Sequence, residues 1–421
     1  RQMCIRDSIV KKEEDIMKKF NKFLSVAVAS AMVMAMAGCG NTDNGSAATG
    51  TNAATESAAA SDSAASGSVF KIGGIGPTTG GAAVYGLAVQ HGAEIAIEEI
   101  NAAGGINGYQ VEFKFQDDEA DAEKSVNAYN ALKDWGAQII DGSTTSGACI
   151  AVTDKTKEDN MFQITPSGSA VECVQYDNNF RVCFSNPNQG LASAQYIGEN
   201  GLAEKIAVIY DSSDVYSSGI YEKFAKEAEN QPFEIVAAEA FTADNKTDFS
   251  VQLQKAKDAG ADMVFLPIYY QESALILTQA AAMGYAPKWF SCDGMDGILG
   301  GVDNFDVSLT EGVMLLTPFA ADATDDLTQS FVTKYKEKYG ETPNQFAADS
   351  YDAIYVIKAA IEKSGVTPDM SVSDICDGMK AAMTEITVDG LTGSGMTWTA
   401  DGEANKAPKA VVIENGAYKA M

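Results

Sequence analysis

Histidine is nearly absent from this chain, which removes most catalytic and metal-binding arrangements that depend on imidazole. The one histidine among 421 residues is His91. A metal site with several histidine ligands is therefore excluded, and a Ser-His or Cys-His catalytic pair would have to use this residue. The motifs GxSxG, HExxH and GxxxxGKS or GxxxxGKT are also missing. We therefore expect neither an enzyme nor a bound metal or other cofactor.

Positively charged side chains are scarce as well. Lys and Arg total 30 against 58 Asp and Glu, which gives a formal charge of -28 at pH 7. A surface this acidic repels phosphate backbones, so nucleic acid is excluded as a partner. Apolar residues make up 46% and charged residues 21% of the chain, as in soluble globular proteins. At this length two domains are expected.

Cysteine is present seven times but never as a CxxC pair, so a zinc cluster is not supported. Cys4 and Cys39 lie near the N-terminus, and the others are Cys149, Cys173, Cys183, Cys292 and Cys376. Export would permit a disulfide between Cys173 and Cys183, the closest pair in sequence. The alternative is that all five are small buried hydrophobic side chains. Both alternatives fit the sequence.

A processing signal begins inside the chain, at Met17. Three nearby lysines are followed by Phe23–Ala37, an apolar run too short to span a bilayer comfortably. The run ends in Met36-Ala37-Gly38-Cys39, which resembles the lipobox of bacterial lipoproteins, with Met36 in place of the usual leucine. This resemblance implies a signal peptide over 17–38 and a diacylglyceryl group on Cys39. The alternative is an ordinary secretory signal with an incidental cysteine.

The segments on either side of this signal carry no fold information. Residues 1–16 precede the start signal and are interpreted as non-native sequence or a misread start. Residues 39–68 contain the lipidated cysteine and a stretch rich in Ala, Ser, Thr, Asn and Gly, which predicts a flexible linker. We therefore expect an exported protein, held by its lipid on the outer face of the bacterial cytoplasmic membrane or on the periplasmic side.

From Val69 onward, short apolar strands alternate with amphipathic helices, which predicts an α/β fold with parallel sheets covered by helices on both faces. The predicted strands are Val69–Gly73, Val111–Phe115, Gln138–Ile140, Phe162–Ile164, Lys205–Tyr210, Glu234–Ala237, Met263–Pro267, Trp289–Ser291 and Gly312–Leu316. The predicted helices are Leu87–Ala102, Ala122–Trp135, Ser146–Asn160, Leu191–Glu199, Gly219–Asn230, Phe249–Ala259 and Glu272–Met283. The two runs, before and after about Asn186, predict two lobes.

Polar and aromatic residues recur just beyond the carboxyl ends of six of these strands. In open α/β sheets ligands bind at this edge. Hydroxyls and helix-start amides bind carboxylates, a lone Asp suits an ammonium, and tyrosines supply apolar walls with a polar tip. The residues selected on this basis are Tyr85, Thr145, Ser146, Ser167, Ser169, Tyr216, Tyr269 and Asp293. Their recurrence in both halves predicts a ligand cleft between two lobes.

The chain resembles the branched-chain amino-acid-binding proteins, the leucine/isoleucine/valine-type extracytoplasmic receptors of bacterial ABC importers. The most specific segment is Ile100–Tyr109, and the resemblance covers nearly everything from Val69 to the C-terminus. It implies a type I periplasmic-binding-protein fold, with two Rossmann-like lobes joined by three hinge crossings. On this chain the crossings would lie near Phe184–Asn188, Thr317–Ala321 and Asp389–Gly393. Lobe 1 would be 69–186 plus 320–390, and lobe 2 would be 187–319 plus 391–421.

The same resemblance implies a role for each candidate residue. The carboxylate of an amino acid would meet Thr145 or Ser146 and the backbone of Ser167. Ser169 would bind either charged group, and Asp293 the ammonium. Tyr85, Tyr216 and Tyr269 would line the cleft. Asp293 stands where Glu is common in the best-known members.

The function that follows is capture of an amino acid, branched-chain or similar, by hinge closure, and its delivery to an ABC permease in the membrane. A ligand-sensing receptor of the same fold is the first alternative. Binding of amides, urea or aromatic acids by the same cleft is another, because members of the family differ in ligand. A secreted enzyme is the most distant alternative, since no nucleophile–base pair is recognised.

Overall fold

The computed structural model of the chain describes residues 67–421. The predicted signal peptide, the predicted lipidation site Cys39 and nearly all of the predicted linker lie outside the described residues. Within residues 67–421, no helix is both long enough and apolar enough to cross a membrane.

The first sheet has five parallel strands in the order β2-β1-β3-β4-β5. They are β1 (Phe70–Gly76), β2 (Val111–Asp117), β3 (Ile139–Gly142), β4 (Phe162–Thr165) and β5 (Asn179–Arg181). Every residue of β3, β4 and β5 is buried, and all but one of β1. Strands covered on both faces read as continuous apolar runs, which is why the sequence locates most of them.

Three helices connect the strands of this sheet: α2 (Ala83–Ala102), α3 (Ala122–Trp135) and α4 (Ser146–Asp159). Helix α3 begins where the Asp121 carboxylate accepts a hydrogen bond from the Lys124 amide, and it ends at Gly136, which has φ 93°. Such caps satisfy backbone groups that the helix leaves unpaired. The predicted ranges of all three helices overlap the observed ones.

The second sheet has seven strands in the order β12-β11-β10-β9-β8-β6-β7. They are β6 (Lys205–Asp211), β7 (Glu234–Phe241), β8 (Met263–Leu266), β9 (Lys288–Ser291), β10 (Met314–Thr317), β11 (Lys409–Glu414) and β12 (Ala417–Ala420). Strands β6 to β10 are parallel, but β11 runs antiparallel to both β10 and β12. The expectation of purely parallel sheets is therefore wrong at this edge. Asn415 and Gly416 both have positive φ, which suits a tight antiparallel hairpin.

Two pairs of helices pack on opposite faces of the second sheet. Helices α5 (Asn186–Glu199) and α6 (Val215–Ala228) share a core with Ile206 and Val208. Helices α7 (Ser250–Asp258) and α8 (Tyr270–Ala282) belong to the core that contains Ala207 and Ile209. Successive residues of β6 point to opposite faces, so its unbroken apolar run serves both cores.

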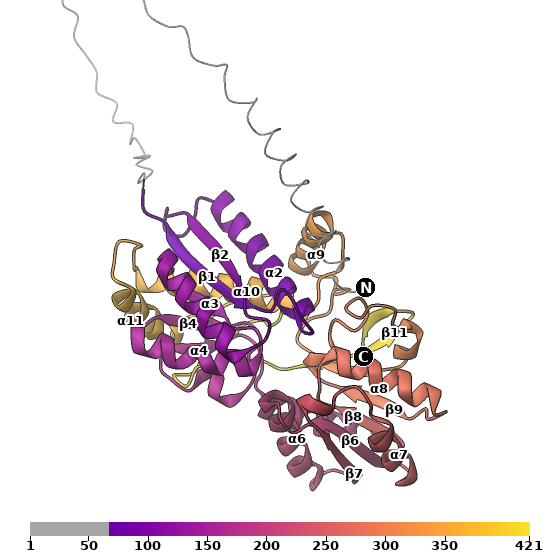
Figure 1. The fold of residues 1–421 in the computed structure, drawn as a ribbon. Helices are drawn as coiled ribbons and strands as arrows, with labels where there is room; N and C mark the ends of the chain where they lie inside the picture. The colour runs from indigo at the N-terminus through magenta and orange to yellow at the C-terminus, as the bar shows by residue number, and fades with distance from the viewer. Residues whose placement is uncertain (1–66) are drawn as a thin grey trace, which may run out of the picture. The chain divides into compact units, whose positions relative to one another are not determined.

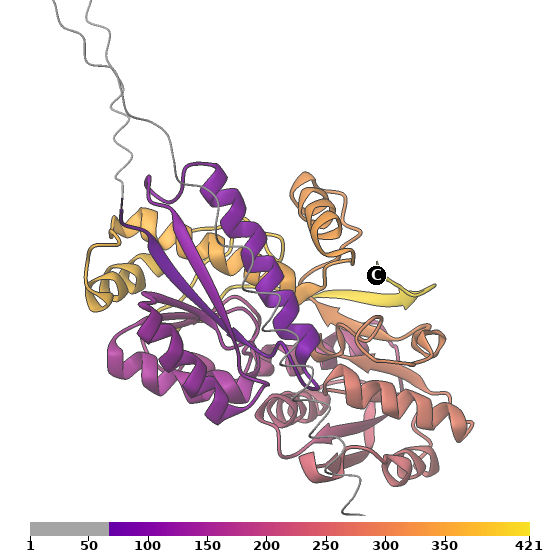
Figure 2. The same ribbon diagram turned by 45° about the horizontal axis from the view of Figure 1, so that its top comes forward.

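After β10 the chain returns to the first sheet. It forms α9 (Asp326–Tyr339), α10 (Gln345–Ser364) and α11 (Val372–Met383), and α10 lies beside α2 although about 250 residues separate them (Figures 1 and 2). The first sheet contains only strands that precede α5, and the second only strands that follow it. The exact lobe boundaries and the three crossings stay predictions.

The five cysteines of the described part, residues 67–421, are all free and buried. The alternative in which they act as small hydrophobic side chains is confirmed, and Cys173 and Cys183 form no disulfide in this structure.

Candidate functional site

Seven of the eight predicted site residues line one small cavity. They are Tyr85, Thr145, Ser146, Ser167, Tyr216, Tyr269 and Asp293, joined by Thr144, Gly294 and Phe346. The cavity has a volume of about 20 Å³, which is enough for roughly one water molecule.

The strand order explains why these residues meet. Thr145 and Ser146 follow β3 and Ser167 follows β4 in the first sheet, whereas Tyr216, Tyr269 and Asp293 follow β6, β8 and β9 in the second. All six are therefore placed beyond carboxyl ends of parallel strands. The cavity lies where these two strand edges face each other, and Tyr85 reaches it from the first turn of α2.

Two hydroxyl groups on the first-sheet side are buried without a hydrogen-bond partner: Thr145 Oγ1 and Ser169 Oγ. Thr145 is the N-cap residue of α4, but its side chain does not cap the helix. The first amides of a helix have no partner within it, so a carboxylate placed here would find both a hydroxyl and amide donors. The first-sheet side of the cavity is therefore suited to an anion.

The neighbouring hydroxyls are already engaged. Ser146 Oγ accepts hydrogen bonds of 3.2 Å from the amides of Ser169 and Ala170, and Ser167 Oγ donates one of 2.6 Å to the Thr144 carbonyl. Of the neighbours Thr145 and Ser146, Ser146 therefore has its hydroxyl engaged and Thr145 has its hydroxyl unpaired. Ser169 is fully buried beside Ser146 and is the one predicted residue that does not line the cavity.

On the opposite side, Asp293 is a buried carboxylate held by neutral donors. Tyr216 donates to its Oδ1 at 2.6 Å and Gln189 to its Oδ2 at 2.7 Å. Burial raises the pKa of Asp293 to about 7, and the negative charge of Asp349 adds to this, while the Tyr216 and Gln189 hydrogen bonds act in the opposite direction. No cation lies among its described contacts. A buried carboxylate of this kind is stabilised by an incoming cation.

Aromatic rings form the walls between these two polar ends. The Tyr216 and Tyr269 rings are stacked 5.0 Å apart, and the Tyr85 ring lies 4.4 Å from that of Phe346. The Tyr85 hydroxyl donates to the Gly294 carbonyl and accepts from the Tyr270 amide. Because Tyr85 belongs to α2 and Gly294 follows β9, this contact joins the two sides of the cavity and keeps it closed.

Three lining residues and one supporting residue were not among the predicted site residues: Thr144, Gly294, Phe346 and Gln189. Thr144 and Gly294 are direct neighbours of predicted positions, so the strand-end argument reaches them. Phe346 lies in the first turn of α10, whose N-cap is Asn344, and no strand precedes it. Gln189 acts from within α5. A search restricted to strand ends has no signal for these two.

The sequence profile of the family described as periplasmic binding protein matches residues 69–417. The chain belongs to the periplasmic binding protein family. The type I fold and the solute-binding role expected from the resemblance are thereby confirmed. Membership also implies an exported, periplasmic protein.

Individual relatives agree with this assignment. The chain is 30% identical over 300 residues to Leu/Ile/Val-binding protein homolog 3 of Brucella melitensis, which covers 71% of this chain and 80% of the relative. It is 30% identical over 302 residues to the leucine-, isoleucine-, valine-, threonine- and alanine-binding protein of Pseudomonas aeruginosa, covering 70% of this chain and 78% of that one.

Among solved structures, the branched-chain amino acid transporter substrate-binding protein LivJ of Streptococcus pneumoniae, in complex with isoleucine, superimposes with a TM-score of 0.76. It is 28% identical, and the match covers 84% of this chain and 98% of that one. A solute-binding protein of R. palustris in complex with benzoate gives a TM-score of 0.73 at 19% identity, over 84% of this chain and 95% of that one, which shows the fold alone.

Proposed function

We propose that this protein captures an amino acid with an apolar, branched-chain side chain in the cavity lined by Tyr85 and Asp293, and delivers it to an ABC permease. The observation that carries the proposal is that the two sides of one cavity suit groups of opposite charge. One side holds a buried carboxylate without a cation, Asp293, and the other holds the unpaired Thr145 hydroxyl at a helix N-terminus. A zwitterion satisfies both.

Each residue then has a proposed role. Asp293 binds the ammonium, Thr145 and the start of α4 bind the carboxylate, and Ser146, Ser167 and Ser169 support that end. Tyr85, Tyr216, Tyr269 and Phe346 surround the side chain, and their apolar faces favour an aliphatic one. The names of the Brucella and Pseudomonas relatives and the isoleucine in the Streptococcus structure support a branched-chain ligand.

Binding requires the cavity to open. Pockets for small ligands usually measure about 300–1,000 Å³, whereas this one holds about 20 Å³. The contact between the Tyr85 hydroxyl and Gly294 must separate to admit an amino acid, and we propose that the predicted hinge crossings near 184–188, 317–321 and 389–393 allow it. The ligand then holds the two lobes, 69–186 plus 320–390 and 187–319 plus 391–421, in the closed state.

In this proposal, the protein binds its ligand without converting it chemically. We also propose that it is anchored to the membrane at Cys39. The anchor rests on the sequence resemblance of Met36–Cys39 to a lipobox. Cys39→Ser should release the protein from membranes or leave it unprocessed, as detergent partitioning would measure. Equal partitioning of both forms into water would exclude lipidation.

A thermal-shift panel tests the ligand. Leucine, isoleucine and valine at saturating concentration should each raise the melting temperature, by the linkage of binding to folding, whereas urea and acetamide should not. Benzoate is the decisive comparison. The same aromatic walls could accept its ring, but it lacks the ammonium group that we propose binds to Asp293. Stabilisation by benzoate and by none of the amino acids would show that the ligand is an aromatic acid and not an amino acid. Turnover of any compound would revive the enzyme alternative.

A further inference from the structure

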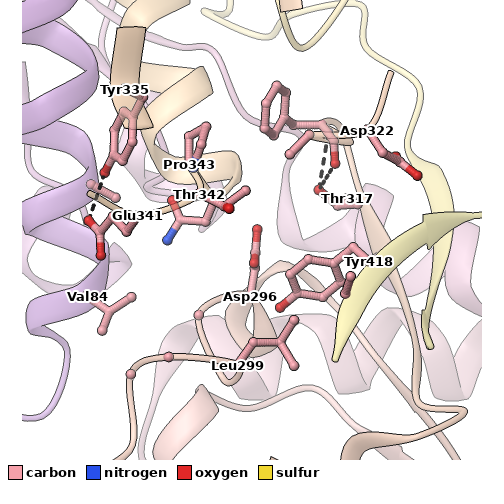
Figure 3. Close-up of a pocket in the computed structure, with 18 of the residues that line it drawn as sticks. Val84, Asp296, Leu299, Thr317, Asp322, Tyr335, Glu341, Thr342, Pro343 and Tyr418 are labelled. Carbon is pink, nitrogen blue, oxygen red and sulfur yellow. Dashed lines mark hydrogen bonds between the residues drawn. The ribbon is translucent and has the colours of Figure 1, made fainter. Parts of the chain in front are cut away.

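A second and much larger cavity, of about 500 Å³, lies outside the proposed amino-acid site. Its wall is built from the start of α2, the loop after β9, the end of β10, the segment before α10, and β12. Figure 3 shows Val84, Asp296, Leu299, Thr317, Tyr335 and Tyr418 around it. None of its lining residues lines the small cavity.

Asp296 gives this cavity its chemical character. Its side chain is almost fully buried and points into the open space (Figure 3), where Oδ1 has no hydrogen-bond partner. The other oxygen, Oδ2, accepts a 2.9 Å hydrogen bond from the Gln345 amide. The buried hydroxyl of Tyr418 lies beside the carboxyl group. A buried carboxyl oxygen and a phenol oxygen therefore lie together in the wall of the cavity, and burial raises the pKa of Asp296.

The remaining surface is apolar close to Asp296 and mixed in charge further out. Val84, Leu299 and Phe319 supply apolar wall. The lining also includes two further carboxylates and two lysines, but Asp322 is 4.0 Å from Lys419, and Glu341 lies within 3.8 Å of His91. These side chains are partly exposed and screened by water, so Asp296 is the one deeply buried carboxyl group that lines this cavity.

We propose that this cavity is a second binding site, for a small organic amine with an apolar body. The ammonium group donates to Asp296 Oδ1 and to the Tyr418 oxygen, and the apolar body covers Val84 and Leu299. An ammonium is favoured over a neutral donor because a buried carboxylate gains most from a cation. The inference does not depend on the proposed function, since it uses none of the residues of the amino-acid site.

The test uses phenethylamine as the probe and phenethyl alcohol as its neutral counterpart, in calorimetric titrations. They are run with the amino-acid site saturated with leucine, and repeated with Asp293→Asn without leucine. The native protein should bind the amine at least about tenfold more tightly than the alcohol, because only the amine pairs with the carboxylate. The repeat with Asp293→Asn should give the same affinity. Equal affinities for amine and alcohol, or loss of amine binding in Asp293→Asn, would overturn the proposal.

Two variants locate the site. Asp296→Asn should weaken amine binding at least about tenfold, whereas Asp322→Asn, a carboxylate on the rim of the same cavity, should change it less than about threefold. Since Asp296→Asn disturbs the start of α10 and could fail to fold, Leu299→Trp provides a second test by filling the space beside Asp296. It should abolish amine binding and leave Asp296 intact. Unchanged binding in Leu299→Trp or in folded Asp296→Asn would contradict the assignment.

Discussion

At the scale of single residues, the role of a buried aspartate depends on its hydrogen-bond partners and on the cavity that it lines. Asp293 and Asp296 lie three positions apart and are both buried, yet each lines a different cavity. Asp293 receives side-chain hydrogen bonds from Tyr216 and Gln189, while Asp296 receives a backbone one from Gln345. The two aspartates can therefore be tested separately.

Removing the charge of Asp293 should cost the amino-acid ligand its ammonium contact. Asp293→Asn keeps the size of the side chain but leaves a desolvated ammonium without an anion, so affinity for leucine should fall by about 2–5 kcal/mol. Isothermal titration calorimetry measures the loss. Asp322→Asn is the control that removes an equal charge, and it should change leucine affinity by less than about 0.5 kcal/mol, because Asp322 lines the other cavity. Near-native affinity for Asp293→Asn would show that the ammonium is held elsewhere.

At the residue scale, sequence reasoning selected side chains that follow strands, and the structure places most of them around one cavity. Six predicted residues line one cavity because parallel strands of each sheet bring the residues that follow them to the same edge, and the two edges face each other. It missed Phe346 and Gln189, which reach the site from helices. A helical residue faces a site only through the packing of its helix, and no local pattern encodes that packing.

At the scale of elements, α2 and α10 pack closely against each other. A Cβ added to Gly92 on α2 would lie 2.0 Å from the carbonyl oxygen of Ala347 on α10. A methyl group cannot occupy that space, so glycine here sets how near the two helices approach. The pairing in turn places Phe346 against Tyr85.

Gly92→Ala should therefore destabilise the protein even though alanine favours helix. Pushing apart two packed helices costs about 1–3 kcal/mol, more than the gain in helix propensity of about 1 kcal/mol. Gly147→Ala on α4 is the matched control, because a Cβ there meets no atom within 4 Å. It should be neutral or slightly stabilising. Urea denaturation measures the free energy of unfolding of both variants. Equal stability of Gly92→Ala and Gly147→Ala would show that α10 can move away from α2 without cost.

The sequence also contains a signal for an element that strand–helix alternation does not predict. Asn415-Gly416 separates two β-rich runs and forms the turn between β11 and β12. An Asn-Gly pair is a strong hairpin signal. The short β5 has only three residues and no comparable local signal, and the return of α9 to α11 towards the first sheet depends on long-range packing. Local periodicity therefore predicts most elements but not their final connections.

For the whole molecule, buried carboxyl groups set the response to pH. Burial raises the pKa of seven aspartates above the value of an unfolded chain. The pKa rises to about 7 for Asp141 and Asp293 and to about 6 for Asp118, Asp214 and Asp349, and it is raised for Asp296 and Asp352 as well. The folded state therefore binds more protons than the unfolded state between about pH 4 and pH 7. Stability falls as the pH rises through this window.

The ligand-free protein should accordingly melt at a higher temperature at pH 5 than at pH 8. Asp293→Asn removes one of these groups and should reduce the difference. Asp322→Asn removes an equal charge from an exposed site and should leave the difference nearly unchanged. Differential scanning calorimetry at fixed salt measures all three proteins. A melting temperature that rises from pH 5 to pH 8 would contradict this account.

The central claim is that one cavity holds both charged ends of an amino acid between two sheets. A crystal structure of the protein grown with leucine tests it most directly. The ammonium should lie within hydrogen-bond distance of Asp293, with the carboxylate at Thr145 and the first amides of α4 and the side chain among Tyr85, Tyr216 and Tyr269. Leucine bound in the opposite orientation, in the larger cavity beside Asp296, or nowhere at saturating concentration would contradict the claim.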